Sequence, residues 1–209
     1  MVRILCIGDS HIPNRAKELP KKIEEKLSEL TRDLLFDYTF FTGDVVNFPS
    51  ILDFLNSLTK RDVFIVMGNM DYYFGNKDAP LYQKLDIVFN NKQKLTVGLT
   101  HGAQISPRGD LNQLETLAIE RNYQILVSGH THKEEINLTK DGILLINPGS
   151  VTGAWSFVAS KIPTFIELDI IESSEQINLR LYQIDKLSRE ITTATFYYIF
   201  QNNQISRNY

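Results

Sequence analysis

Three residue types that often carry chemistry are scarce in this chain. Its 209 residues include one cysteine, one tryptophan and four histidines. A single cysteine cannot close a disulfide within the chain, which excludes a disulfide-stabilised secreted scaffold. Cys6 lies inside the apolar run VRILCI, where a small buried side chain is expected rather than a reactive thiol. This usage predicts a protein of a reducing compartment.

Long apolar runs and an excess of basic charge are also lacking. The first apolar run begins at Val2 and is interrupted by Arg3, so it is too short for a signal peptide or a membrane span. Lys and Arg number 22 against 25 Asp and Glu, for a net charge of -3. We therefore expect a cytoplasmic protein without a transmembrane segment, and nucleic acid is not expected as its main partner.

No repeat, low-complexity stretch or Pro/Gly/Ser-rich linker divides the chain. With 43% hydrophobic residues, it is long enough for one substantial core. We predict a single domain over residues 1–200 and a frayed tail over 201–209, because the last nine residues are polar and patternless. The preceding run TATFYYIF is apolar on both alternations, which predicts a buried strand, with an exposed partner patch as the alternative.

The order of the expected elements indicates an α/β fold. Strand-like runs at 2–7, 38–42 and 62–67 alternate with helical patterns at 20–35 and 49–58, each with a proline near its start. A third helix is expected over 111–122, with Asp110 as its N-cap. From about residue 124 onward the pattern is strand-like and contains no convincing helix. The expected strands of that half are 124–128, 142–147, 164–170, 177–184 and 192–200.

Five of the predicted strands end in a residue that can bind a metal. The endings read GDSH, GD, GNMD, HG (after a further strand-like run at 94–100) and GHTH, and together they contain every histidine of the chain. Singly, a Gly-Asp is more often a turn and a lone histidine more often a structural residue. Since the carboxyl ends of strands in an α/β sheet meet at one crevice, the five together predict a metal site. The candidate ligands are Asp9, His11, Asp44, Asn69, His101, His130 and His132.

Carboxylate, amide and imidazole groups in these proportions favour Mn, Zn or Fe over Ca or Mg. Seven ligands exceed the needs of one ion and suit two divalent ions that share a carboxylate, an arrangement used for displacement at phosphorus. His130 and His132 are then expected to reach different ions. The nearby Asn147–Ser150 segment NPGS is explained equally well as a turn and as a pocket wall.

The series GDxH, GD, GNxD, His and GHxH resembles the calcineurin-like metallophosphoesterases over residues 9–132. The segments GDSHIPNR, HGAQISPRGD, GHTHK, NPGSVTGAW and IPTFIELDI resemble the family of small retromer subunits over residues 2–182. The resemblance implies a four-layer αββα sandwich of two mixed β-sheets. It also implies that Asp44 bridges two metals, and it assigns the remaining ligands to them. Asp9, His11 and His132 would hold one metal, and Asn69, His101 and His130 the other.

The resemblance leaves two functional classes open. The first is a retromer-type scaffold for endosomal protein sorting, which would bind an α-solenoid subunit partly through Ile105 and Pro107 and reach internal membranes peripherally through that complex. Ser106 and Arg108 are polar in the same segment, where the family uses apolar side chains. This scaffold reading is the one the long matching segments favour.

The second class is a metal-dependent phosphodiesterase that works through a hydroxide bridging the metals, with Asp44 and Asn69 as its catalytic residues. The chain keeps all seven ligands, which favours metal binding. Met70 stands where many superfamily members carry a proton donor, and a thioether cannot donate a proton. We therefore expect weak activity, restricted to activated esters. A protein-serine/threonine phosphatase is less favoured, because the chain has little room for loops that shape a protein-substrate groove.

Overall fold

Two β-sheets packed face to face form the centre of the protein. This computed structural model describes residues 1–46 and 49–208. The larger sheet has the strand order β12-β11-β10-β9-β1-β2-β3, and the smaller has the order β4-β5-β6-β8-β7. Parallel pairs (β1 with β2, β5 with β6) and antiparallel pairs (β1 with β9, β4 with β5) occur in both sheets. The predicted pair of mixed sheets is confirmed.

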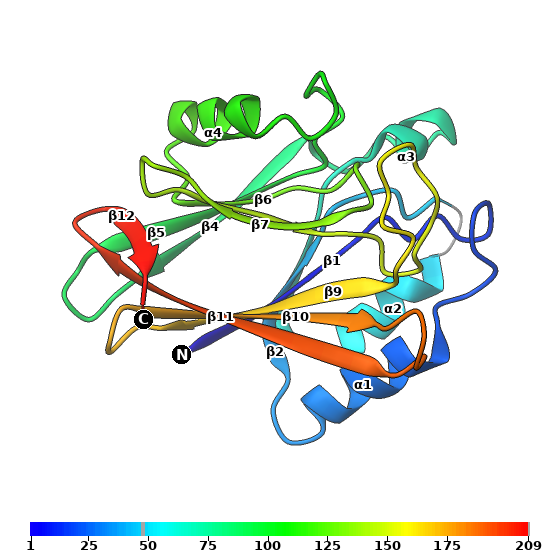
Figure 1. The fold of residues 1–209 in the computed structure, drawn as a ribbon, viewed down its shortest axis with the longest axis horizontal. Helices are drawn as coiled ribbons and strands as arrows, with labels where there is room; N and C mark the ends of the chain where they lie inside the picture. Colours follow the sequence, from blue (N-terminus) through cyan, green and yellow to red (C-terminus); the bar gives the residue numbers. More distant parts are fainter. Residues whose placement is uncertain (47–48, 209) are drawn as a thin grey trace.

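Helices cover the outer faces of this sandwich (Figure 1). α1 and α2 pack on the larger sheet, and α4 packs on the smaller one, on the opposite side of the molecule. The helices are α1 (Lys21–Thr31), α2 (Pro49–Ser57), α3 (Asn69–Tyr73) and α4 (Leu111–Glu120). No helix in the described part of the chain is long and apolar enough to cross a membrane.

The first six strands lie in the helix-rich half of the chain. They are β1 (Val2–Ile7), β2 (Phe36–Phe41), β3 (Thr59–Ile65), β4 (Tyr82–Val88), β5 (Lys94–Thr100) and β6 (Ile125–Val127). The remaining strands follow without an intervening helix, as predicted. They are β7 (Glu134–Leu138), β8 (Leu144–Pro148), β9 (Thr164–Ile171), β10 (Gln176–Ile184), β11 (Ile191–Gln201) and β12 (Gln204–Arg207).

The alternation of side chains along each strand supplies two cores. Along β9, Ile166 and Leu168 face the smaller sheet, whereas Phe165 faces α1 and α2. On α1, Ile23 and Leu27 face the same core as Phe165 and are fully buried. A third, smaller core lies beneath α4, whose N-cap Asp110 accepts a hydrogen bond from the Gln113 N–H at 2.9 Å as predicted.

Several expected boundaries are wrong. α1 ends at Thr31, so Leu34 lies beyond the helix and is 52% exposed. The tail does not fray over 204–207, because β12 pairs with β11 and Ile205 enters the core between the sheets. The described residues 201–208 therefore belong to the domain.

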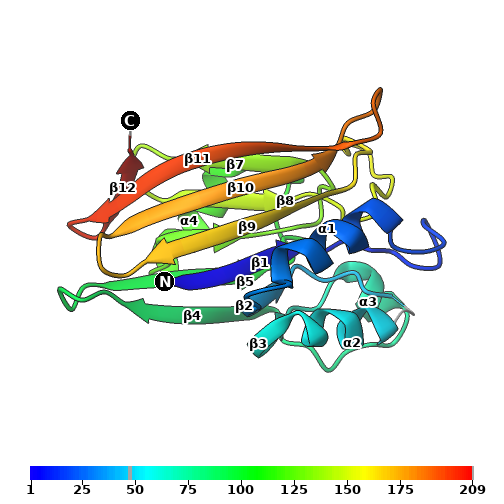
Figure 2. The ribbon, with the colours of Figure 1, turned by 90° about the horizontal axis from the view of Figure 1, so that it is seen from below.

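β11 is only partly the buried strand that its sequence predicted. Residues 192–195 are exposed, and only Tyr198 and Phe200 are buried. The helices do not cover the whole outer face of the larger sheet (Figure 2). The apolar composition of this run therefore exceeds what the fold buries.

Candidate metal centre

The loops that follow β1, β2, β5 and β6 meet at one end of the sandwich, away from both chain termini. Backbone hydrogen bonds tie these loops together, from Asp9 N to Gly43 O at 3.0 Å and from His11 N to Asp44 O at 3.1 Å. Five of the seven candidate ligands adopt positive φ, which is costly for non-glycine residues and typical of functional sites. These are Asp9 (50°), His11 (49°), Asp44 (58°), His130 (70°) and His132 (61°).

Two glycines allow the loops to approach so closely. A Cβ on Gly68 would lie 1.9 Å from Asp44 Oδ1, and one on Gly129 would lie 2.6 Å from Asp9 Oδ2. Contacts below 3 Å would force the backbone apart. Glycine is therefore required beside both carboxylates.

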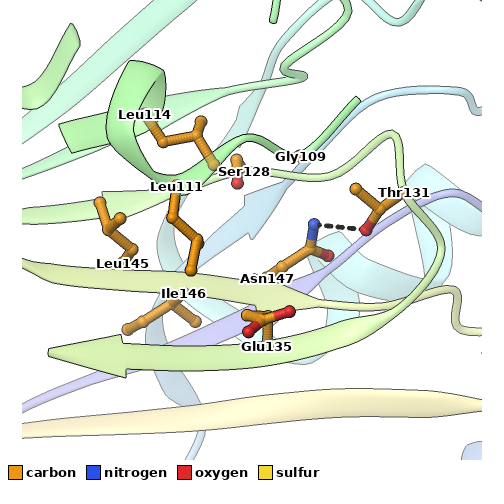
Figure 3. A pocket seen from close by; sticks show the side chains of 9 residues that line it. All are labelled: Gly109, Leu111, Leu114, Ser128, Thr131, Glu135, Leu145, Ile146 and Asn147. Carbon is orange, nitrogen blue, oxygen red and sulfur yellow. Dashed lines mark hydrogen bonds between the residues drawn. The ribbon is translucent and has the colours of Figure 1, made fainter. Parts of the chain in front are cut away.

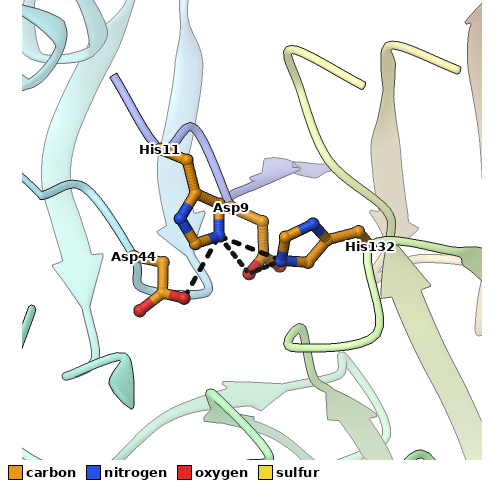
Figure 4. A group of neighbouring side chains, drawn as sticks. All are labelled: Asp9, His11, Asp44 and His132. Atoms are coloured by element: carbon orange, nitrogen blue, oxygen red, sulfur yellow. Dashed lines mark hydrogen bonds and ion pairs between the residues drawn. The ribbon is translucent and has the colours of Figure 1, made fainter. Parts of the chain in front are cut away.

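One group of candidate ligands comprises Asp9, His11, Asp44 and His132, whose ligand atoms all lie within 4.8 Å of one another (Figure 4). The two Nε2 atoms of His11 and His132 are 2.9 Å apart. His11 Nε2 is 3.2 Å from Asp44 Oδ2, and His132 Nε2 is 3.4 Å from Asp9 Oδ1. Four side chains from three separate loops thus surround a common point.

A second group forms around His101. Its Nε2 atom lies 3.1 Å from Asn69 Oδ1 and 3.2 Å from His130 Nδ1. The same atom is 3.6 Å from Asp44 Oδ2, the carboxylate oxygen that also faces His11. The structure therefore brings all seven predicted side chains together, with Asp44 between the two groups. Their role as metal ligands stays a prediction.

Backbone carbonyls fix the orientation of two imidazoles. His101 Nδ1 is 2.7 Å from Thr42 O, and His132 Nδ1 is 2.9 Å from Ala154 O. A carbonyl oxygen only accepts, so Nδ1 must carry the proton in both rings. When each ring is neutral, Nε2 presents its lone pair to the centre, as a metal ligand must.

Burial dominates the electrostatics of the centre. It lowers the pKa of His11 and of His130 to about 3, and it raises the pKa of Asp44 to about 6. Burial would also raise the pKa of Asp9, but the His132 imidazole, 3.4 Å from Oδ1, and the nearby rings of His101 and His11 hold it at about 2. The Asp9 carboxylate also raises the pKa of His132 despite burial.

Two polar atoms in this buried cluster have no hydrogen-bond partner among the described residues, Asp9 Oδ1 and His11 Nδ1. An unpaired carboxylate oxygen at a buried position is costly. The inward-facing lone pairs of Asp9, Asp44 and His132 would repel one another without a positive charge between them. The donor set therefore fits divalent metal ions.

Comparison with known proteins places this chain in a family. The model of the calcineurin-like phosphoesterase superfamily domain matches residues 2–172. The chain belongs to this superfamily. Its members use divalent metals, which agrees with the group of side chains that could hold an ion.

Relatives and solved structures of the superfamily differ in what they are named for. A probable metallophosphoesterase of Methanocaldococcus jannaschii is 38% identical over 146 residues, which span 70% of this chain and 66% of that protein. The structure of vacuolar protein sorting 29 from Cryptosporidium parvum has a TM-score of 0.80 at 31% identity, covering 95% of this chain and 98% of that chain. Wild-type Vps29 of Entamoeba histolytica complexed with Zn²⁺ has a TM-score of 0.77 at 27% identity, covering 94% and 99%.

Asp71 holds the loop of Asp44 through hydrogen bonds to its backbone, a role that the sequence did not reveal. Its Oδ2 accepts from the N–H groups of Asp44 at 2.7 Å and Gly68 at 3.0 Å, and its Oδ1 accepts from Val46 N at 2.8 Å. One buried carboxylate thereby positions the loop of the central ligand. The only sequence signal was its place at the end of GNMD.

The NPGS segment also supports the site. Ser150 Oγ donates to Asp9 O at 2.7 Å and accepts from Ala154 N at 2.8 Å, so it links the Asp9 loop to the carbonyl that orients His132. Asn147 donates to Gly129 O at 2.9 Å. It also donates to Thr131 Oγ1 at 3.0 Å, a bond that Figure 3 shows. Asn147 lines a water-sized cavity of about 20 Å³ beneath α4, which is separate from the seven ligands.

Met70 lies in α3 directly after Asn69. Its backbone N–H donates to Asp44 Oδ1 at 2.8 Å, and its side chain is only partly buried. The backbone of this residue thus positions the central carboxylate, while its thioether offers no proton to the site.

Of the two residues predicted to bind a partner, Ile105 is buried and Pro107 is exposed. Ile105 is 7% exposed and packs with Leu114 and Tyr123 beneath α4, so it offers almost no surface to a partner. Pro107 is exposed. Arg108 donates to His130 O at 3.2 Å, which ties this loop to the centre.

Proposed function

We propose that the chain is a metal-dependent phosphoesterase that cleaves phosphodiesters. The observation that carries the proposal is the position of Asp44 Oδ2, 3.2 Å from His11 Nε2 and 3.6 Å from His101 Nε2. Asp44 would therefore contribute to both of two ions, of which Asp9, His11 and His132 would hold one and Asn69, His101 and His130 the other. Two such ions would supply Lewis acidity and positive charge to a phosphate in the crevice.

The residues of the chain supply the rest of the site. The carbonyls of Thr42 and Ala154 hold two imidazoles in one orientation, and Asp71 fixes the loop of Asp44. These hydrogen bonds would limit rearrangement of the ligands when a phosphate binds. Because the Met70 side chain donates no proton, the leaving oxygen must depart without an acid from this position.

Hydrolysis of bis-p-nitrophenyl phosphate with Mn²⁺ tests the proposal. Wild-type protein should turn over, and Asp44→Asn should lose at least about 10³-fold in kcat/KM, because several kcal/mol of transition-state charge stabilisation depend on the metals. Asp62→Asn makes the same chemical change at an exposed site and should leave the rate unchanged. If folded protein with bound metal showed no turnover, the proposed phosphodiesterase activity would be refuted.

The missing proton donor has its own test. Rates for a series of aryl and alkyl phosphodiesters should fall steeply as the leaving-group pKa rises, because no acid assists departure. Equal rates across the series would show that another group protonates the leaving oxygen.

A retromer-type scaffold is the second candidate, and two exposed aromatic residues favour it. Tyr73 is 85% exposed on α3, and Phe157 is 86% exposed in the segment that follows Ala154. Apolar side chains beside a site can anchor a partner, and a complex would bring the chain to endosomal membranes. We rank this function second because Ile105 is buried and Ser106 and Arg108 are polar.

Binding to the retromer α-solenoid subunit of the same source tests the scaffold. The double variant Tyr73→Ser with Phe157→Ser should weaken binding by more than about tenfold if these residues are anchors. Ile119→Ser, at a 51% exposed position on α4, is the matched control. Lack of binding by the wild type would exclude the scaffold without affecting the hydrolysis test.

A further inference from the structure

A second charged feature lies outside the metal centre. A pocket of about 310 Å³ opens between the start of α1, the segment before β9 and the loop that joins β10 to β11. These segments lie at the same end of the molecule in both views (Figures 1 and 2). Five basic side chains line the pocket. They are Lys21, Lys22, Lys161, Lys186 and Arg189.

The basic charge of this pocket is only partly compensated. Lys21 lies 3.7 Å from Glu25, and Lys22 pairs with Glu190. Within residues 1–46 and 49–208, the other three cations have no ion-pair partner. In a protein with a net charge of -3, such a cluster makes one local surface attractive to anions.

An apolar side chain projects beside these cations. Leu187 is 94% exposed, between Lys186 and Arg189. The loop that carries it is held in shape, because Asp185 Oδ1 accepts from the N–H groups of Leu187 at 3.0 Å and Ser188 at 2.7 Å. Asp185 N also donates to Glu190 O at 2.8 Å. The leucine is therefore kept in the solvent by an ordered turn.

We propose that this pocket and Leu187 dock the chain directly onto membranes that contain anionic phospholipids. The cations would meet the headgroup phosphates, and Leu187 would enter the apolar layer beneath them, which is how surface-bound proteins combine charge with apolar insertion. A soluble anion would satisfy the cations but gives Leu187 no role. This inference goes beyond the proposed function and does not depend on metal binding.

Vesicle co-sedimentation tests the docking surface. Wild-type protein should bind phosphatidylcholine vesicles that contain phosphatidylserine and should not bind vesicles of phosphatidylcholine alone. The double variant Lys186→Glu with Arg189→Glu should bind at least about 25-fold more weakly, at about fivefold for each cation removed. Leu187→Ser should weaken binding roughly tenfold, because the apolar contact is lost.

A matched control variant and soluble anions distinguish membrane docking from binding of another anionic ligand. Lys84→Glu with Lys140→Glu changes net charge equally at exposed positions elsewhere and should bind like the wild type. Absence of wild-type binding, or equal loss in this control, overturns the proposal. So does phosphate or polyglutamate binding that needs Lys186 and Arg189 but not Leu187, because the pocket would then serve a soluble anion or an acidic protein segment.

Discussion

The metal centre differs from a second buried charged cluster, which surrounds Glu167 on the outer face of the larger sheet, in how its carboxylates are paired. In the second cluster Glu167 accepts from Arg3 Nη2 at 2.7 Å, Arg180 Nε at 3.0 Å and Tyr182 Oη at 2.9 Å. The metal centre instead leaves Asp9 Oδ1 without a hydrogen-bond partner and, among the described residues, without a Lys or Arg at ion-pair distance, whereas the unbonded oxygen of the second cluster, Asp169 Oδ1, lies 3.8 Å from Arg3 Nε. Both clusters are buried, so burial alone does not mark function.

The two clusters differ in whether they contain the cationic side chains that balance their carboxylates. The Glu167 cluster pairs its central carboxylate with cations from β1 and β10 and hydrogen-bonds both of its oxygens. The metal centre has two carboxylates and four imidazoles in contact but no cationic side chain among its seven ligands. A buried cluster that lacks its own counter-charge fits a ligand that supplies it. The metal centre therefore fits divalent ions, whereas the Glu167 cluster contains its own cations.

The largest effect on the free energy of unfolding should come from breaking the paired cluster around Glu167. Glu167→Ala leaves Arg3 and Arg180 without their shared carboxylate, and breaking a buried pair in this way costs about 3–5 kcal/mol of unfolding free energy. Urea denaturation with and without Mn²⁺ measures this. The increment due to Mn²⁺ should be the same in the variant as in the wild type, because the clusters share no residues. Loss of the increment would show that the two regions are coupled.

A smaller effect is expected at the boundary of the metal centre. Asp71→Asn keeps one acceptor oxygen for three N–H groups and so loosens the Asp44 loop. Metal affinity should fall about 10- to 100-fold, as for other residues that orient ligands. Mn²⁺ titration gives the Kd, and Asp53→Asn, exposed on α2, is the control. A lower stability with an unchanged Kd would make Asp71 purely structural.

The contributions of Glu167 and Asp169 to folding stability should change with pH in opposite directions. Burial would raise the pKa of Glu167, but hydrogen bonds from Arg180 and Arg3 lower it. Its contribution to stability is therefore present above the unfolded pKa and is lost as pH falls through the folded pKa. Burial and the Glu167 charge raise the pKa of Asp169, so stability from that group is lost as pH rises through its folded pKa.

Two variants separate these opposite contributions. Between about pH 5 and pH 3, Glu167→Gln should lose less stability than the wild type, whereas Asp169→Asn should lose more. Chemical denaturation at several pH values measures both slopes. Parallel slopes in the three proteins would mean that neither carboxylate changes its pKa on folding.

The sequence predicted that the seven candidate ligands lie together, because they follow strands whose ends must meet. It missed what depends on contacts across the fold. β12 contains one apolar residue, Ile205, and its pairing with β11 decides its structure. β4 and β7 lie at the edges of the smaller sheet, where partial exposure weakens the apolar pattern. Arg3 looked like an interruption of β1, because its partner Glu167 lies 164 residues away.

The smallest effect on the free energy of unfolding should come from an ion pair that is exposed rather than buried. Lys21 and Glu25 are four residues apart on α1, 3.7 Å from each other, with side chains that are 86% and 63% exposed. Solvent and salt screen such pairs, so Glu25→Gln should cost no more than about 0.5 kcal/mol. Thermal unfolding at low and high salt checks this. A cost that approaches that of Glu167→Ala would mean that charge pairing, rather than burial of the pair, sets the stability of this protein, and the contrast between the two buried clusters would lose its physical basis.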